Sequence, residues 1–201
     1  MKPVWQTHLS PDVPVDDEYH AAPRAEIASF FEAPPGLVVD VGCGAGATGA
    51  LLKRKFPGTV VIGIERNARA AAVARTRLDD VIFADLADVR LDERIGDRSI
   101  GALLLLDVLE HLVDPWRALV RMRTWLGPES RVLASVPNIR NLETLERLAS
   151  GHFDYAARGV LDVTHLRFFT RSSLRRMFEE TGYDVVSIEA LPHISPDDLS
   201  V

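Results

Sequence analysis

Three glycines and two acids in the first third of the chain have the types and spacing of a nucleotide-binding site. The first apolar run ends in an acid and a loop with alternating glycines: Asp40, Gly42, Gly44 and Gly46. Glycine has no Cβ, so such a loop lets bare backbone approach a ligand. Glu65 closes a second apolar run, where an acid can hold a ribose diol. The pattern predicts an adenosine-containing cofactor.

Asp40 distinguishes between two cofactors that the glycine spacing alone would fit. A dinucleotide places its pyrophosphate over the loop, at the helix N-terminus, where a carboxylate would repel it. S-adenosylmethionine (SAM) has an ammonium and a sulfonium there, and an acid attracts both. Asp40 therefore favours SAM and opposes a nicotinamide-dependent oxidoreductase.

A second group of polar residues follows a later apolar run, 100–106. Asp107, Glu110 and His111 lie in the string DVLEHLVDP, and His165 lies in DVTHLRFFT. Methyl transfer to a hydroxyl requires removal of a proton, and a neutral histidine near pH 7 suits that task. His165 and His111 are the candidate catalytic bases.

Apolar runs alternate with amphipathic stretches, as βαβ units require. Strands are expected over 37–41, 60–64, 81–84, 100–106, 131–136 and 184–189. Helices are expected over 23–32, 47–56, 68–78, 115–126, 142–149 and 172–181. The predicted fold is an α/β, doubly wound, mostly parallel sheet. It forms one domain over 23–201, after an N-terminal arm over 1–22.

The strings DVGCGAG, DVLEHLVDP and DVTHLRFFT resemble class I SAM-dependent methyltransferases over about 19–188. The last two resemble a subgroup that tailors small molecules and sugars. The resemblance implies a Rossmann-like fold, a SAM cofactor that leaves as S-adenosylhomocysteine, and a lid or insert over about 138–171. It also implies a final antiparallel strand. Residues 190–201 are too polar and proline-broken to supply it, so the chain has been cut short or leaves that sheet edge uncovered, which would permit a homodimer.

The resemblance also assigns roles to residues. Asp85 would accept a hydrogen bond from the adenine amino group, and Leu86 would pack on the adenine ring. Apart from the resemblance, Arg24 lies just before the first strand, where it either pairs with the SAM carboxylate or is a surface charge. The whole predicted cofactor site comprises Arg24, Asp40, Gly42, Cys43, Gly44, Gly46, Glu65, Arg66, Asp85, Leu86, Asp107 and Val108. The predicted acceptor site and lid comprise Tyr19, Thr164, His165, Arg167, Phe168 and Phe169, and the two phenylalanines are first interpreted as core or lid packing.

A metal-assisted site is an alternative. Asp107, Glu110, His111 and His165 resemble the hard-metal cluster of small-RNA 2′-O-methyltransferases, in which an ion would lower the pKa of the acceptor. Here the first acid is one carbon shorter, the flanking sequence is unlike that of the RNA enzymes, and magnesium favours fewer nitrogen ligands. The sequence therefore does not favour a metal.

Composition limits the partners. The net charge is −6, from 29 acidic and 23 basic residues, which opposes nonspecific binding to nucleic acid or an anionic membrane. Cys43 is the only cysteine, which fits a reducing compartment, and no apolar stretch resembles a signal peptide or a membrane span. A cytoplasmic location is expected.

We expect a SAM-dependent methyltransferase that O-methylates a small polar metabolite, a sugar or glycoside, or a natural-product intermediate. Two alternatives stay open. One is a non-catalytic methyltransferase-like binding domain, which could lose the lid and the last strand. The other is a methyltransferase of RNA or another macromolecule with a metal-assisted site, which the acidic balance opposes.

Overall fold

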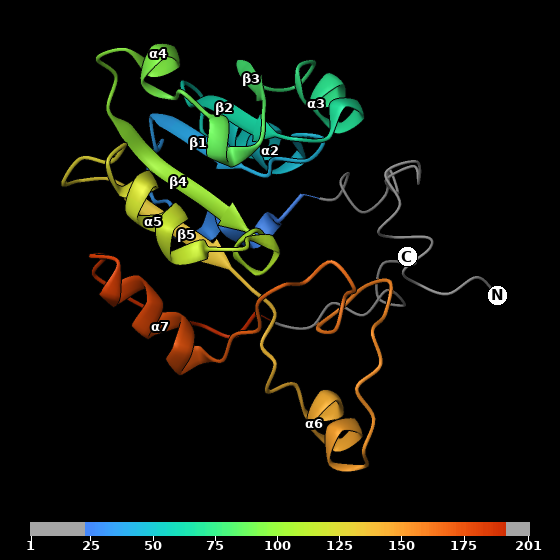
Figure 1. The fold of residues 1–201 in the computed structure, drawn as a ribbon. Coiled ribbons are helices and arrows are strands. Elements are labelled where there is room, and N and C mark those ends of the chain that lie inside the picture. The colour runs from blue at the N-terminus through green and yellow to red at the C-terminus, as the bar shows by residue number, and fades with distance from the viewer. Residues whose placement is uncertain (1–22, 192–201) are drawn as a thin grey trace.

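The computed structural model describes residues 23–191, which form helical layers on both faces of a parallel sheet (Figure 1). The predicted arm over 1–22 lies outside the described residues. Five strands pair in the order β3-β2-β1-β4-β5, all parallel. They are β1 (Leu37–Val41), β2 (Val60–Glu65), β3 (Asp80–Phe83), β4 (Ile100–Leu106) and β5 (Arg131–Ser135). The strand order reverses beside β1, which confirms the predicted doubly wound, Rossmann-like fold.

Side chains of β1 alternate between the two faces of the sheet, because successive residues of a strand point to opposite sides. Val38 packs in a core cluster with residues of the helices η1 (Ala25–Phe30) and α2 (Ala47–Lys55). Val39 and Val41 pack in a cluster with residues of the helices α5 (Pro115–Arg123) and α7 (Arg171–Glu180). Both faces are therefore buried, which explains why the strands are continuous apolar runs. The helices are η1 (Ala25–Phe30), α2 (Ala47–Lys55), α3 (Ala68–Ala74), η2 (Leu86–Asp88), α4 (Asp92–Ile95), η3 (Leu109–His111), α5 (Pro115–Arg123), α6 (Leu142–Ala149) and α7 (Arg171–Glu180).

Local signals fix where the longer helices begin. The Asp114 carboxylate accepts a hydrogen bond of 2.9 Å from the backbone of Arg117, and proline occupies the first position of α5. Thr170 and Ser173 form a reciprocal capping box at the start of α7. The helix expected over 23–32 is instead the short 3₁₀ helix η1, and the helix expected over 68–78 ends at Ala74.

The prediction of a strand over 184–189 is wrong. Residues 184–189 form no strand, and Val186 is 96% exposed. The adjoining chain is held against helices instead: the Tyr183 hydroxyl donates to the Leu119 carbonyl of α5 at 2.8 Å, and Arg175 of α7 donates to the Val185 carbonyl at 3.3 Å. If residues 184–189 paired with β5 and no further strand followed, they would themselves form an exposed edge of the sheet. Through residue 191 no antiparallel strand is present, and β5 is an edge strand.

The segment between β5 and α7 contains the predicted insert. Its helix α6 stands apart from the layers that cover the sheet (Figure 1), and three of its leucines, Leu142, Leu145 and Leu148, are exposed. The segment returns to the sheet edge where the backbone amide of Ile139 donates to the Phe169 carbonyl at 2.9 Å. Within residues 23–191, no helix combines the length and apolar composition required to cross a bilayer.

Candidate functional site

The glycine loop after β1 adopts a backbone that needs glycine. Gly42, Gly44 and Gly46 have φ of 68°, 54° and 77°, values that side chains rarely permit. A Cβ on Gly42 would lie 2.8 Å from the Val108 side chain, so the loop and the segment after β4 approach closely. The loop leaves the sheet beside the position where strand order reverses, which is where sheets of this class bind ligands.

Glu65 fastens this loop to the end of β2. One carboxylate oxygen accepts from the Gly44 backbone amide at 2.9 Å, and the other accepts from the Asn67 amide at 2.6 Å. Glu65 is only 6% exposed. Each oxygen retains a further lone pair, so the carboxylate can still accept from ribose hydroxyls. Glu65 thus organises the loop in addition to its predicted cofactor contact.

Asp40 is a buried acid beneath the loop, with 3% exposure. Burial raises its pKa to about 7, and the nearby carboxylate of Glu65 adds to this effect. Burial likewise raises the pKa of the Cys43 thiol, and its sulfur lies close against Gly63 of β2. An ammonium beside Asp40 would favour its charged form and lower this pKa.

Asp40→Asn should change how stability depends on pH in the ligand-free protein. Because the folded-state pKa is raised from 3.8 to about 7, the protonated form stabilises the fold and this contribution is lost as pH rises toward 7. The free energy of unfolding of the wild type should fall relative to Asp40→Asn by up to about 1.4 kcal/mol per pH unit over that range. Urea unfolding at several pH values measures the difference, and parallel curves for the two proteins would contradict it.

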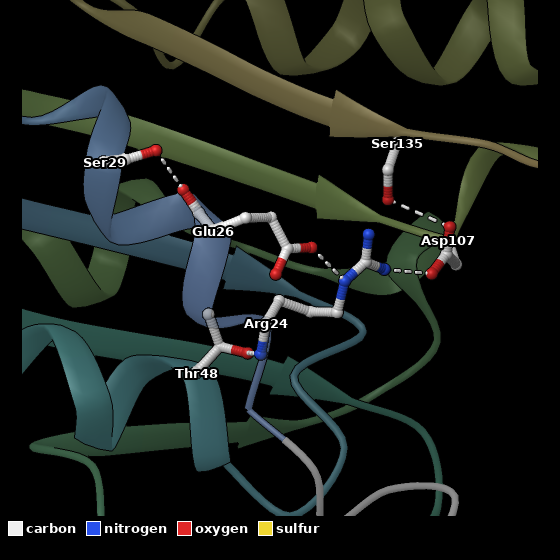
Figure 2. A network of polar contacts seen from close by, with 6 residues as sticks. All are labelled: Arg24, Glu26, Ser29, Thr48, Asp107 and Ser135. Carbon is white, nitrogen blue, oxygen red and sulfur yellow. Dashed lines mark hydrogen bonds and ion pairs between the residues drawn. The ribbon is translucent and has the colours of Figure 1, made fainter. Parts of the chain in front are cut away.

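Arg24 and Asp107 meet across the carboxyl edge of the sheet. The guanidinium lies between the carboxylates of Glu26 and Asp107 (Figure 2), with an Nε–Oε1 distance of 2.6 Å to Glu26 and a hydrogen-bonded ion pair to Asp107. Burial alone would lower the pKa of Arg24, but the two acids raise it. Arg24 is therefore charged at this edge, as a partner of the SAM carboxylate must be.

Three further residues position this pair, and the sequence reasoning missed all of them. The Thr48 hydroxyl of α2 accepts from the Arg24 backbone amide at 3.1 Å, and the Ser135 hydroxyl donates to Asp107 at 2.9 Å. Glu26 binds the guanidinium from η1. Ser135 ends β5 and pairs with Leu106, the residue before Asp107. Its place at the end of that strand was the only sequence signal that it could contact Asp107.

The residues predicted at the adenine side lie at or just beyond the ends of β2 and β3. Asp85 is exposed and accepts a hydrogen bond of 3.0 Å from the Ala87 amide, so it caps η2. Leu86 is half-buried against the core, and Arg66 is exposed. Their assignment to the adenine remains a prediction.

Glu110, His111 and His165 come together at the end of β4, although His165 is far along the chain. The two imidazole rings contact edge to face, with centroids 4.9 Å apart and planes at 71°. The Glu110 carbonyl accepts from the amides of Leu166 and Arg167 at 2.8 Å and 3.0 Å, which ties the segment DVTHLRFFT to η3. Burial lowers the pKa of His111, and His165 adds to the shift. Burial raises the pKa of Glu110 to about 8.

The predicted acceptor and lid residues divide into two groups. Thr164 and Arg167 lie beside His111 and η3: Thr164 contacts the His111 ring, and the Arg167 guanidinium donates to the Val113 carbonyl. Phe169 is 3% exposed within the core, whereas Phe168 is 36% exposed and faces Phe153. Phe169 is thus a core packing residue, in line with the interpretation of the two phenylalanines as core or lid packing. Tyr19 lies outside the described residues.

Comparison with known proteins adds the family. A family model described as a methyltransferase domain matches residues 16–188. The demethylmenaquinone methyltransferase of Thermotoga maritima is 27% identical over 78% of this chain and 73% of its own length. The trans-aconitate 2-methyltransferase of an Acidovorax species is 39% identical, and the match covers 34% of this chain and 28% of that relative. One chain of a solved Haloferax volcanii complex, between the Trm112 methyltransferase activator and a methyltransferase, superposes with a TM-score of 0.64 at 18% identity, over 92% of this chain and 75% of that one.

Proposed function

Because the chain belongs to the methyltransferase-domain family, whose cofactor is SAM, we propose that it transfers the SAM methyl group to a hydroxyl of a small polar acceptor. The observation that carries the acceptor chemistry is the pair of histidines, His111 and His165, at the carboxyl end of β4. Their rings contact edge to face at the sheet edge that also holds Arg24 and Asp107. Nitrogen lone pairs at this edge support removal of a hydroxyl proton.

The reaction needs alignment and deprotonation more than it needs a stronger leaving group. SAM already has a sulfonium, and the glycine loop with Glu65 and the charged Arg24 can hold its ribose and carboxylate ends. The acceptor hydroxyl passes its proton to an imidazole nitrogen, and its oxygen attacks the methyl carbon. The carbon–sulfur bond breaks, its electron pair goes to sulfur, and S-adenosylhomocysteine remains.

Small acceptors are supported by the relatives. The similar proteins include methyltransferases named for trans-aconitate and for demethylmenaquinone. The chain spans between 28% and 48% of the length of the trans-aconitate enzymes it matches, so the acceptor is proposed for this chain and not transferred from them. The net charge of −6 opposes a nucleic-acid substrate.

SAM and S-adenosylhomocysteine should raise the melting temperature, and NAD should not. The reason is the buried Asp40 beneath the loop, which attracts an ammonium and repels a pyrophosphate. A ligand at about 100 times its Kd should add about 2.7 kcal/mol. Thermal-shift titrations measure this. Stabilisation by NAD alone would contradict the proposed cofactor.

Turnover separates an enzyme from a non-catalytic binding domain of the same fold. A screen of hydroxylated metabolites, sugars and glycosides that reads out S-adenosylhomocysteine should find at least one acceptor. SAM binding with no turnover across all acceptor classes would instead support the binding domain.

The edge strand β5 supports a homodimer as a finer proposal. Its outer backbone groups have no partner strand in the described part of the chain. Sedimentation of the purified protein over a range of concentrations tests this proposal, and a monomer at every concentration would exclude it.

A further inference from the structure

We propose that Glu110, His111 and His165 form a binding site for one divalent first-row transition-metal ion. One ligand atom from each side chain lies within 4.8 Å of the others, a spacing from which all three can reach a common ion. The ion's role in catalysis rests on the proposed function, but its binding does not.

The hydrogen bonds of both imidazoles leave the same nitrogen free. Nδ1 of His165 lies 3.0 Å from the Val160 carbonyl, and Nδ1 of His111 lies 3.2 Å from the carbonyl and from the hydroxyl of Thr164. Carbonyls only accept, and the Thr164 hydroxyl already donates to Asp162 at 2.7 Å. Each Nδ1 therefore has the proton and each Nε2 has a lone pair. Metal-binding histidines are oriented in this way by an outer carbonyl.

The carboxylate of Glu110 supplies the third lone-pair group. Glu110 is 1% exposed, and neither carboxylate oxygen has a hydrogen-bond partner among the described residues. A buried carboxylate without a donor is costly. A cation between it and the two imidazoles would offset that cost, because all three groups present lone pairs.

The structure removes Asp107 from the four residues that the sequence suggested. Its two oxygens are engaged by Arg24 and Ser135. Two imidazoles and one carboxylate suit Zn²⁺ or Mn²⁺ better than Mg²⁺, which prefers oxygen ligands. Three protein ligands also leave coordination positions open, as in catalytic sites.

An open position gives the site a chemical use. An acceptor hydroxyl bound there would have a lowered pKa and would release its proton to solvent, which leaves an alkoxide for attack on the SAM methyl group. The histidines would then act as ligands, and no imidazole would need to take the proton itself.

Calorimetric titration of the chelator-treated chain with Zn²⁺ and Mn²⁺, without SAM, tests the site. One ion per chain should bind, more tightly than Mg²⁺. Glu110→Gln, His111→Ala and His165→Ala should each weaken binding on the order of 100-fold, and Thr164→Val should weaken it roughly 10- to 100-fold through the His111 ring. His152→Ala and Glu143→Gln, which change exposed residues of the same types, should bind ions like the wild type.

Glu110→Gln controls for loss of folding in the alanine variants, because glutamine keeps the shape of the buried Glu110 side chain. The proposal is overturned if the wild type binds neither ion below about 1 mM, or if folded variants bind ions like the wild type. SAM binding to the metal-free chain is measured in parallel. A chain that binds SAM but no ion refutes the site and leaves the proposed function intact, whereas a chain that binds the ion but no SAM refutes the proposed function alone.

Discussion

His165→Ala should lower turnover by about 10² to 10⁴ while SAM affinity stays the same. The His165 ring contacts the His111 ring, 4.9 Å between centroids, in a segment that hydrogen bonds tie to η3. Whether its nitrogen takes the acceptor proton or binds an ion that makes the hydroxyl acidic, the variant cannot form the alkoxide. Single-turnover rates with a defined acceptor, beside SAM titrations, measure both quantities.

His152→Ala is the matched control for this variant, because His152 is exposed just beyond α6. It should turn over like the wild type. Rescue of His165→Ala by excess Zn²⁺ or Mn²⁺ would support the ligand role, and no rescue would support a general base. A wild-type rate for His165→Ala would contradict both roles and leave alignment as the means of catalysis.

Glu65→Ala should weaken SAM binding by about 2 to 3 kcal/mol, a factor of roughly 30 to 150. The variant removes a charged acceptor from the ribose hydroxyls. It also leaves the amides of Gly44 and Asn67 without their acceptor, so the glycine loop loses its attachment to β2. Calorimetry with SAM measures the loss, and Glu129→Ala, an exposed acid after α5, should bind SAM normally.

A ribose analogue separates the direct contact from the loop effect. The 2′-deoxy analogue of S-adenosylhomocysteine should bind the wild type more weakly than the parent compound, whereas Glu65→Ala should not distinguish the two. Equal discrimination by both proteins would assign Glu65 to loop organisation alone. Unchanged SAM affinity in Glu65→Ala would remove it from the cofactor site.

The sequence by itself determined the five parallel strands and the cofactor loop. The strands expected over 37–41 and 100–106 agree with β1 and β4 at both ends, because buried parallel strands are short apolar runs bounded by turn residues. The glycine loop and the start of the helix expected at 115 were readable for the same reason, since each depends on a few consecutive residues. Asp40 likewise favoured SAM before any contact was known.

Only the tertiary structure decided which distant residues meet. The sequence paired Arg24 with a ligand but gave no sign of Asp107 as its partner. It grouped Asp107 with Glu110, His111 and His165, whereas only the last three bring their ligand atoms together. It also predicted a strand over 184–189, which contacts with α5 and α7 displace. Most of these contacts join residues from distant parts of the chain. The apolar periodicity of a segment predicts its local structure but not which distant segment it will contact. The chemistry of each side chain can be read from the sequence. Which side chains meet at the carboxyl edge of the sheet is set by packing across the whole domain.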